Sequence, residues 1–220
     1  MNKISIKIIK FIYNSIPAPK WLKKLASLYF IPKSLIYAKK RNGAVYYSEV
    51  GQDLFVLDTL KNKKNGYYIE LGSNDPICNN NTFVLEKKYG WKGISFEIDS
   101  DFVSSFQFKR HNLCVECDAT SFDYLKCFKE NKVPSRVDYL QVDIDPSLNS
   151  LAALKRLPFS EYRFSTITFE HDRYSSGDAV MLESRQFLIS MGYKLQMPNV
   201  KNQDRDFEDW WIDKQYLIND

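Results

Sequence analysis

Acidic residues close short β-rich runs of the sequence, and glycine is scarce in the turns that follow. Glu70 closes the run YYIE and is followed by a single glycine, Gly72, whereas Glu97 closes the run GISFE. A turn that binds a pyrophosphate needs three glycines, which let the phosphates approach the backbone of a helix N-terminus. The second and third glycines are missing here, and carboxylates repel phosphates. The pattern therefore indicates a ligand with a cationic group and a ribose but no phosphate.

S-Adenosylmethionine is a ligand of this kind. We expect Glu70 to face its amino group, Gly72 to allow close approach of the backbone, and Glu97 to hold the two ribose hydroxyls. Asp118 and Ala119 follow the third run, LCVEC, where the adenine would lie. The sequence thus predicts one cofactor, bound across the ends of three neighbouring strands.

Strands and helices that could position these residues alternate from residue 48 onward. Such alternation predicts a mainly parallel sheet with helices on both faces, in which ligands bind beyond the carboxyl ends of the strands. After Gly192 it breaks into YKLQMPNV and FEDWWIDKQYL, which we interpret as an antiparallel hairpin at the sheet edge. The expected strands lie in 66–72, 93–99, 113–119, 137–145 and 163–172, and the expected helices in 82–90, 101–110, 121–130, 147–157 and 178–192.

An ordered set of motifs over roughly residues 46–212 resembles the FkbM-like family of class I S-adenosylmethionine-dependent methyltransferases. The motifs are Ser48-x-x-Gly51-Gln52-Asp53, Glu70-Leu71-Gly72-Ser73-Asn74-Asp75, Asn81-Thr82, Trp91-Lys92-Gly93 and Glu97. The resemblance implies a Rossmann-like α/β fold with seven strands, the last two forming the antiparallel edge. It also implies O-methylation of sugar or polyketide-linked hydroxyls. The expected cofactor-binding residues are Gln52, Asp53, Glu70, Gly72, Asn74, Glu97, Asp118, Ala119 and Asp143.

The sequence departs from this family after the fourth run. Many relatives continue Asp-x-Glu-Gly there, whereas this chain has Asp143-Ile144-Asp145-Pro146, and the fifth run ends Glu170-His171-Asp172. Acids and an imidazole at two neighbouring strand ends can converge on Mg²⁺ or Mn²⁺. The placement resembles metal-dependent sugar O-methyltransferases of the macrocin type. The expected metal ligands are Asp143, Asp145, Glu170, His171 and Asp172.

Transfer of a methyl group to a sugar hydroxyl requires removal of the hydroxyl proton by a base, a metal or both. His171 is the first choice as base and the alternative is a metal ligand; it can also be a structural histidine satisfied by its acidic neighbours. Asp143 and Asp145 would face the same side of an extended strand, which favours a catalytic or metal role. One of them can instead cap the helix that begins near residue 147. We therefore expect His171 and Asp143 to be the catalytic residues.

The acceptor pocket is expected to contain Arg173, Tyr174, Arg185 and Trp210. Trp210 lies in Phe207-Glu208-Asp209-Trp210-Trp211, which combines acids and aromatics as a sugar-stacking wall would. Core packing explains the same aromatics, and Arg185 can simply cover a helix face. Ser48 or Asp53 is a candidate N-cap of the first helix of the domain, which Gln52 and Asp53 open.

Charge divides the chain into two parts. The 220 residues carry a net charge of +4, but residues 1–48 hold ten Lys or Arg and no acid, which leaves the remainder at −6. We expect an amphipathic helical arm at 1–45, with helices near 3–15 and 19–29, and a methyltransferase domain at 46–220. The arm is too interrupted to span a bilayer or act as a signal peptide. A membrane surface, the protein core or second subunit of a homodimer, and nucleic-acid phosphates remain open as its partners.

The four cysteines, Cys78, Cys114, Cys117 and Cys127, lack the spacing of a complete zinc site and are expected to be buried and reduced, as in the cytoplasm. The leading hypothesis is a cytoplasmic O-methyltransferase that acts on a glycan, glycolipid or nucleotide-linked sugar near the membrane surface. An RNA methyltransferase and a catalytically silent module are the alternatives, although the acidic body makes nucleic acid the less favoured partner. A dehydrogenase is disfavoured by the missing glycines.

Overall fold

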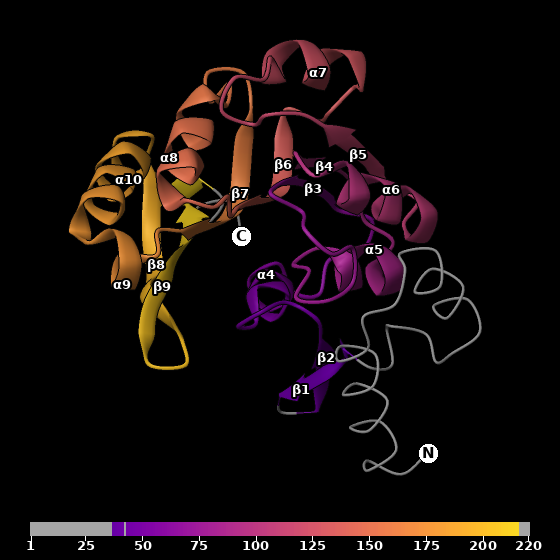
Figure 1. The fold of residues 1–220 in the computed structure, drawn as a ribbon, viewed down its shortest axis with the longest axis horizontal. Helices are drawn as coiled ribbons and strands as arrows, with labels where there is room; N and C mark the ends of the chain where they lie inside the picture. The colour runs from indigo at the N-terminus through magenta and orange to yellow at the C-terminus, as the bar shows by residue number, and fades with distance from the viewer. Residues whose placement is uncertain (1–36, 42, 216–220) are drawn as a thin grey trace.

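The computed structural model describes residues 37–41 and 43–215, which form a seven-stranded sheet with helices on both faces (Figure 1). The strand order is β5-β4-β3-β6-β7-β9-β8. The strands are β3 (Tyr67–Leu71), β4 (Lys92–Glu97), β5 (Leu113–Glu116), β6 (Arg136–Val142), β7 (Arg163–Glu170), β8 (Tyr193–Asn202) and β9 (Arg205–Asp213). The helices are α4 (Gln52–Thr59), α5 (Phe83–Tyr89), α6 (Ser100–Lys109), α7 (Tyr124–Glu130), α8 (Ser147–Arg156), α9 (Arg173–Ser176) and α10 (Asp178–Ser190).

The predicted Rossmann-like α/β architecture is confirmed. Strands β3 to β7 are mutually parallel, β9 is antiparallel to β7, and β8 pairs antiparallel with β9 at the edge. The order reverses between β3 and β6, so their carboxyl ends flank the crevice in which open α/β sheets bind ligands. In Figure 1 these ends point towards the space between α4 and α9.

Two hydrophobic layers enclose the sheet because its central strands are apolar on both faces. On one face Ile69, Leu71 and Phe96 pack with residues of α7, α8 and α10. On the other face Tyr68 and Tyr139 pack with residues of α4 and α5. Burial on both faces is the normal condition of a parallel sheet. The strand ends are thereby held rigidly, which fixes the turns that carry the candidate site.

A hairpin of β1 (Lys39–Arg41) and β2 (Ala44–Tyr46) spans residue 45, where the sequence analysis places the boundary between arm and domain. Lys39 donates from Nζ to the carbonyl oxygens of Ser48 (2.8 Å) and Glu49 (3.1 Å) and to Asn79 Oδ1 (2.9 Å). The hairpin therefore packs against the methyltransferase-like body. The helices expected near 3–15 and 19–29 lie outside the described residues.

The start of α4 differs from both expected caps. Gly51 is the N-cap residue, at φ 106°, and no side chain caps the helix. Asp53 instead accepts hydrogen bonds from the backbone of Tyr47 (2.9 Å) and from Ser48 Oγ (2.5 Å). Its carboxylate thus closes the loop before the helix, because buried backbone N–H groups need acceptors.

The loop after β6 also differs from expectation. The strand ends at Val142, so Asp143 and Asp145 lie beyond it and strand alternation does not place them on one face. Pro146 is the N-cap residue of α8 and no side chain caps this helix, so the cap expected from Asp143 or Asp145 is absent. Ser150 holds the loop, since its Oγ accepts from the Ile144 backbone N–H (2.7 Å).

All four cysteines are free thiols, as predicted, but only Cys114 and Cys127 are buried; Cys78 and Cys117 are half-buried. Among the described residues, none of the helices has the length and apolar character required to cross a bilayer.

Candidate cofactor and carboxylate site

The turn after β3 lies against the end of β6. Gly72 has φ +79°, and a Cβ atom there would lie 1.8 Å from the carbonyl oxygen of Asp143. Its backbone N–H donates to the Phe96 carbonyl oxygen (2.9 Å), which also joins the turn to β4. Only glycine fits this position, because any side chain would collide with backbone. Gly72 thus brings the predicted cofactor turn into contact with the loop that carries Asp143.

Glu97 connects the turns after β3 and β4. Its Oε2 accepts from the Asn74 backbone N–H (2.7 Å), and Oε1 accepts from the N–H groups of Ile98 (2.9 Å) and Asp99 (3.0 Å). The next side chain, Ile98, is 69% exposed. An exposed apolar side chain beside an acid that can meet ribose hydroxyls offers a surface for a nucleobase. Sequence reasoning missed Ile98, although its position directly after Glu97 was a usable signal.

Glu70 is enclosed beneath the same turn, with 1% of its surface exposed. Its Oε2 accepts from Ser95 Oγ (2.6 Å) and Thr82 Oγ1 (3.1 Å). Burial raises the pKa of Glu70 to about 7, against the opposing effect of the Arg110 charge and these hydrogen bonds. The carboxyl group therefore anchors the loop before α5, and its contact with a cofactor amino group remains a prediction.

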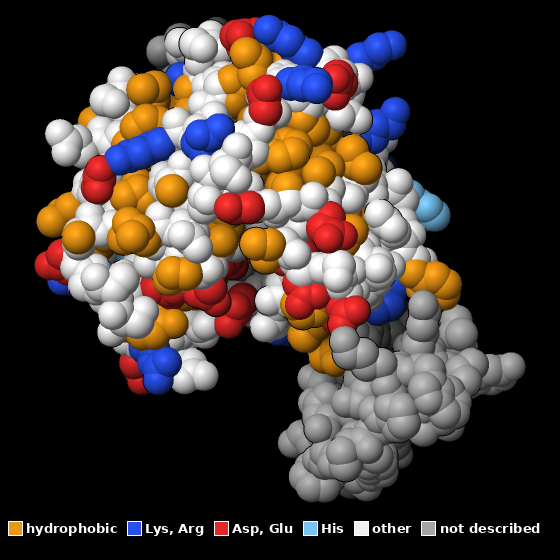
Figure 2. Space-filling model, turned by 45° about the horizontal axis from the view of Figure 1, so that its top comes forward, with side chains coloured by type: hydrophobic (Ala, Val, Ile, Leu, Met, Phe, Trp, Pro, Cys, Tyr) orange, Lys and Arg blue, Asp and Glu red, His pale blue; other side chains and the backbone are white. Residues whose placement is uncertain are grey.

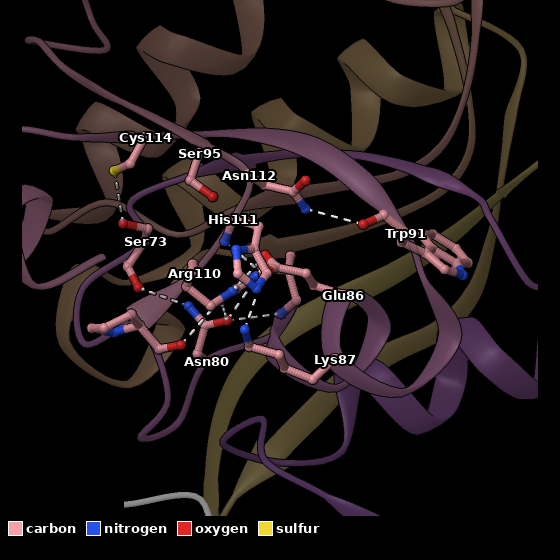
Figure 3. Close-up of polar contacts among 12 residues, drawn as sticks. Ser73, Asn80, Glu86, Lys87, Trp91, Ser95, Arg110, His111, Asn112 and Cys114 are labelled. Carbon is pink, nitrogen blue, oxygen red and sulfur yellow. Dashed lines mark hydrogen bonds and ion pairs between the residues drawn. The ribbon is translucent and has the colours of Figure 1, made fainter. Parts of the chain in front are cut away.

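Arg110 is the centre of a buried polar network behind this loop (Figure 3). Its Nε donates to Glu86 Oε2 (2.7 Å), Nη1 to the Pro76 carbonyl oxygen and Asn80 Oδ1, and Nη2 to Tyr68 Oη and Thr82 Oγ1. All five N–H donors of the guanidinium are satisfied. The sequence analysis missed this role, because in the sequence Arg110 is one charged residue at the end of an expected helix.

The loop between β5 and α7 carries the two residues that are expected to lie near the adenine. Asp118 is exposed and accepts from Thr120 N–H (2.8 Å) and Oγ1 (2.7 Å), and these bonds hold its pKa below the ordinary value. Ala119 is buried and its carbonyl oxygen accepts from Tyr124 Oη (2.8 Å). Both residues lie next to Glu97 along the carboxyl edge, because β5 pairs with β4. Their place agrees with the expected order of ribose and adenine contacts.

Gln52 lies on the other side of the crevice. Its Oε1 accepts from the Val50 N–H (3.0 Å), and its Nε2 lies against the buried Glu208 carboxyl without closing a well-formed hydrogen bond. Asn81 has an unpartnered Oδ1 and is also buried. The bridge between Ser48 and Asn79 holds these two segments together. Asn81 Oδ1 is thus an acceptor available to a cationic ligand group, whereas Asp53 is fully used by its own loop.

Six acids form a carboxylate cluster where β6, β7 and β9 meet, and they are Glu49, Asp143, Asp145, Glu170, Asp172 and Glu208. Burial and the repulsion from Asp143 and Asp172 hold the pKa of Glu170 far above its ordinary range. Burial, together with the nearby acids, raises the pKa of Asp143 to about 6. Figure 2 shows acidic side chains along the rim of a hollow in this part of the molecule.

His171 is fully buried beside the cluster, and both of its ring nitrogens face protein groups. Nδ1 accepts from the Arg173 backbone N–H (3.2 Å), and Nε2 lies 3.6 Å from Asp209 Oδ1. Asp209 in turn binds Arg185 through both oxygens (2.7 and 2.8 Å). This arrangement favours the structural interpretation of His171 over the expected roles of base or metal ligand.

The expected acceptor residues separate into two groups. Arg173 pairs with Asp178 and Asp206 at the start of α9, and the half-exposed Tyr174 stacks on the Arg205 guanidinium (5.1 Å). Tyr174 and Arg205 line a small surface cavity with Asn202 and Gln203. This group remains at the rim of the site.

The second group belongs to the protein interior. Arg185 is held by Asp209, as described above. Trp210 is 4% exposed, stacks on Phe55 (4.7 Å between ring centroids) and donates from Nε1 to Glu208 Oε1 (2.6 Å). These contacts favour core packing for Trp210, since a sugar-stacking face would need an exposed ring.

Comparison with solved structures places this fold among the class I methyltransferases. A protein assigned as an rRNA methylase from Clostridium thermocellum aligns with a TM-score of 0.53 at 11% identity, over 77% of this chain and 97% of its own. A protein assigned as an O-methyltransferase from Klebsiella pneumoniae gives 0.52 at 12% identity, over 92% and 94%. Human methyltransferase 10 domain containing protein gives 0.52 at 10% identity, over 86% and 90%.

At these identities the likeness shows the fold: the chain has the Rossmann-like fold of class I S-adenosylmethionine-dependent methyltransferases. No family model matches the chain. No curated protein matches it either.

Proposed function

We propose that the protein is an S-adenosylmethionine-dependent O-methyltransferase of the FkbM-like type. Its acceptor in this proposal is a sugar hydroxyl in a glycan, a glycolipid or a nucleotide-linked sugar. One observation carries the proposal: Gly72 brings the cofactor turn into backbone contact with Asp143, the acid that follows the end of β6. A proton-accepting group therefore lies beside the expected position of the cofactor, where the acceptor hydroxyl must lose its proton.

The residues around the crevice fit the cofactor. Glu97 and the exposed Ile98 would meet the ribose and adenine, and Asn81 Oδ1 offers an unpartnered buried acceptor for the amino group. S-Adenosylmethionine supplies an electrophilic methyl group on a sulfonium. Gly72 and Glu97 position the two turns, and the rigid sheet beneath them limits their movement.

Asp143 would accept the proton of the acceptor hydroxyl in this proposal. Asp143 directly follows β6 beside the Gly72 turn, so it is the acid of the cluster that we assign as the base. Tyr174 and Arg205 at the rim would contact the sugar, because an exposed ring with a polar partner suits sugar recognition. Mg²⁺ or Mn²⁺ at the neighbouring acids, as the sequence predicts, remains part of the proposal as an assisting cofactor.

An RNA acceptor is the second candidate, since the basic segment 1–48 could contact phosphates and one structural neighbour is assigned as an rRNA methylase. The carboxylate cluster favours a sugar, because it would repel a phosphate backbone at the reacting position. The arm could alternatively hold the enzyme at the cytoplasmic membrane surface or join two subunits.

Transfer of a radiolabelled methyl group tests the proposal. The protein would be incubated with labelled S-adenosylmethionine and, separately, with membrane glycolipid, soluble glycan, nucleotide-linked sugars and total RNA. Label in a sugar-containing fraction that disappears in Asp143→Asn supports the proposal. Label in RNA alone would replace it with the second candidate, and no label in any fraction despite cofactor binding would favour a silent module.

A further inference from the structure

Three acids of the carboxylate cluster place their oxygens close enough to share one ion. One carboxylate oxygen from each of Asp145, Glu170 and Asp172 lies within 4.8 Å of the others. Asp145 comes from the loop after β6, whereas Glu170 ends β7 and Asp172 follows it. The three ligands are thus delivered by two neighbouring strand ends that the sheet holds in place.

A second observation shows that this group lacks a partner. Asp172 is 5% exposed, and its Oδ1 has no hydrogen-bond donor although it is buried. Nearly all buried carboxylate oxygens are paired with a donor or coordinate a cation. A buried carboxylate that has an unpartnered oxygen and lies beside two further carboxyl groups therefore points to a cation.

Positive side chains of the described residues do not fill this position. Arg173, which is adjacent in sequence, is directed to Asp178 and Asp206, and Arg185 is bound by Asp209. None of the ion pairs between residues 37 and 215 that the structure shows involves Asp145, Glu170 or Asp172. An external cation is the remaining source of compensating charge.

We propose that Asp145, Glu170 and Asp172 form a divalent-cation site with an all-oxygen ligand set, selective for hard ions such as Mg²⁺ and Mn²⁺. Three carboxylates at such spacing suit ions that prefer oxygen and retain several waters. His171 lies outside the set, because its nitrogens face Asp209 and the Arg173 backbone. Of the five metal ligands expected from the sequence, the proposed set keeps three, and Asp143 and His171 are not among them.

The cation site adds a metal cofactor to the proposed function. Only the role of the cation in the reaction rests on that proposed function. Two or three open coordination positions would remain for water or acceptor hydroxyls. A bound cation would stabilise the negative charge that develops on an acceptor hydroxyl as it loses its proton. Binding of the ion itself does not depend on methyl transfer.

Titration with Mn²⁺ tests the site directly. The full chain, treated with chelator and then desalted, would be titrated while the electron paramagnetic resonance signal of free Mn²⁺ is recorded. We expect one bound Mn²⁺ per chain, displaced by Mg²⁺. Asp145→Asn and Asp172→Asn should each weaken binding at least tenfold, whereas Glu130→Gln, an exposed acid on α7, should leave it unchanged.

Asp145 is exposed, so its substitution keeps the test valid if Asp172→Asn fails to fold. Binding that is absent in the wild type, or equally strong in Asp145→Asn, would overturn the inference. Calorimetry with S-adenosylmethionine in chelator separates the two proposals. Cofactor binding without Mn²⁺ binding would reject the cation site alone, whereas Mn²⁺ binding without cofactor binding would reject the methyltransferase proposal.

Discussion

The Gly72 Cα lies so close to the Asp143 carbonyl oxygen that a Cβ on Gly72 would approach it to 1.8 Å. This contact fixes the turn after β3 against the loop after β6. It therefore sets the position of the expected cofactor relative to the carboxylate cluster. The close approach, rather than a glycine-rich phosphate loop, explains why a single glycine suffices in this turn.

Gly72→Ala should destabilise the protein by about 3 kcal/mol or more, because the clash is with backbone that cannot move away. Gly43→Ala is the matched control: Gly43 also has positive φ (+82°), but a Cβ there meets nothing within 4 Å. Gly43→Ala should lower the free energy of unfolding by about 1 kcal/mol, because only the strain of a positive φ applies there. Urea unfolding measures both variants, and equal losses would contradict the close approach.

Glu70→Gln should change how stability depends on pH. Because the pKa of Glu70 rises from 4.5 in the unfolded chain to about 7, the folded protein retains the proton more strongly. Its contribution to the free energy of unfolding is complete below pH 4.5 and is lost as the pH rises to about 7, a loss of about 3 kcal/mol. The glutamine variant, always neutral, should therefore gain stability relative to wild type between pH 5 and pH 8.

The groups that surround Glu70 should not titrate in this window. Arg110 stays charged, burial raises the pKa values of Tyr68 and Cys114 to about 12, and that of Tyr139 lies well above its ordinary value. Urea unfolding of wild type and Glu70→Gln at about pH 5 and about pH 8 measures the difference in stability between them. Glu130→Gln is the surface control. A difference between variant and wild type that stays constant from pH 5 to pH 8 would refute the buried, proton-holding Glu70.

Arg110→Met should destabilise the protein by about 3–5 kcal/mol, because it leaves Glu86 as a buried charge without its partner. The double variant Arg110→Met/Glu86→Gln should lose at least about 1 kcal/mol less than the sum of the single losses. Denaturant unfolding of the four proteins completes the cycle. Strictly additive losses would mean that the pair is not coupled.

The variants Asp143→Asn and His171→Gln should show which of the two expected catalytic residues acts as the base. The asparagine variant should lose at least about 100-fold in kcat while it still binds S-adenosylmethionine, as removal of a general base does. The glutamine variant should lose stability but retain kcat within tenfold, since the ring nitrogens of His171 face Asp209 and the Arg173 backbone. The reverse result would restore His171 as the base.

The sequence was sufficient for the sheet because its short β-rich runs alternate regularly with helical segments from residue 48 onward. The sequence alone could not predict the surroundings of side chains whose neighbours come from distant parts of the chain. Asp209 reaches His171 only because β9, and not β8, pairs with β7, and the predicted hairpin did not specify which of its two strands lies next to β7. Arg110 likewise gains its five hydrogen bonds only when α5 and α6 pack beside β3.

The sequence analysis also did not predict the short polar strands near the start of the domain. The β1–β2 hairpin contains Lys39, Lys40 and Arg41, whose charge made this segment resemble the arm. Its strands are held by Lys39 contacts to distant backbone, which local patterns do not reveal. The strand expected over 137–145 ends at Val142 for a related reason. Where a strand ends depends on its pairing with the neighbouring strand.

Calorimetric titration with S-adenosylmethionine tests the central claim most directly. The wild-type protein should bind it with micromolar affinity, and Glu97→Ala should weaken binding at least tenfold, about 1.4 kcal/mol, because the ribose contact and the link between the two turns are both lost. Glu130→Gln should bind as the wild type does. Absence of binding to the folded wild-type protein, with and without Mg²⁺, would contradict the account.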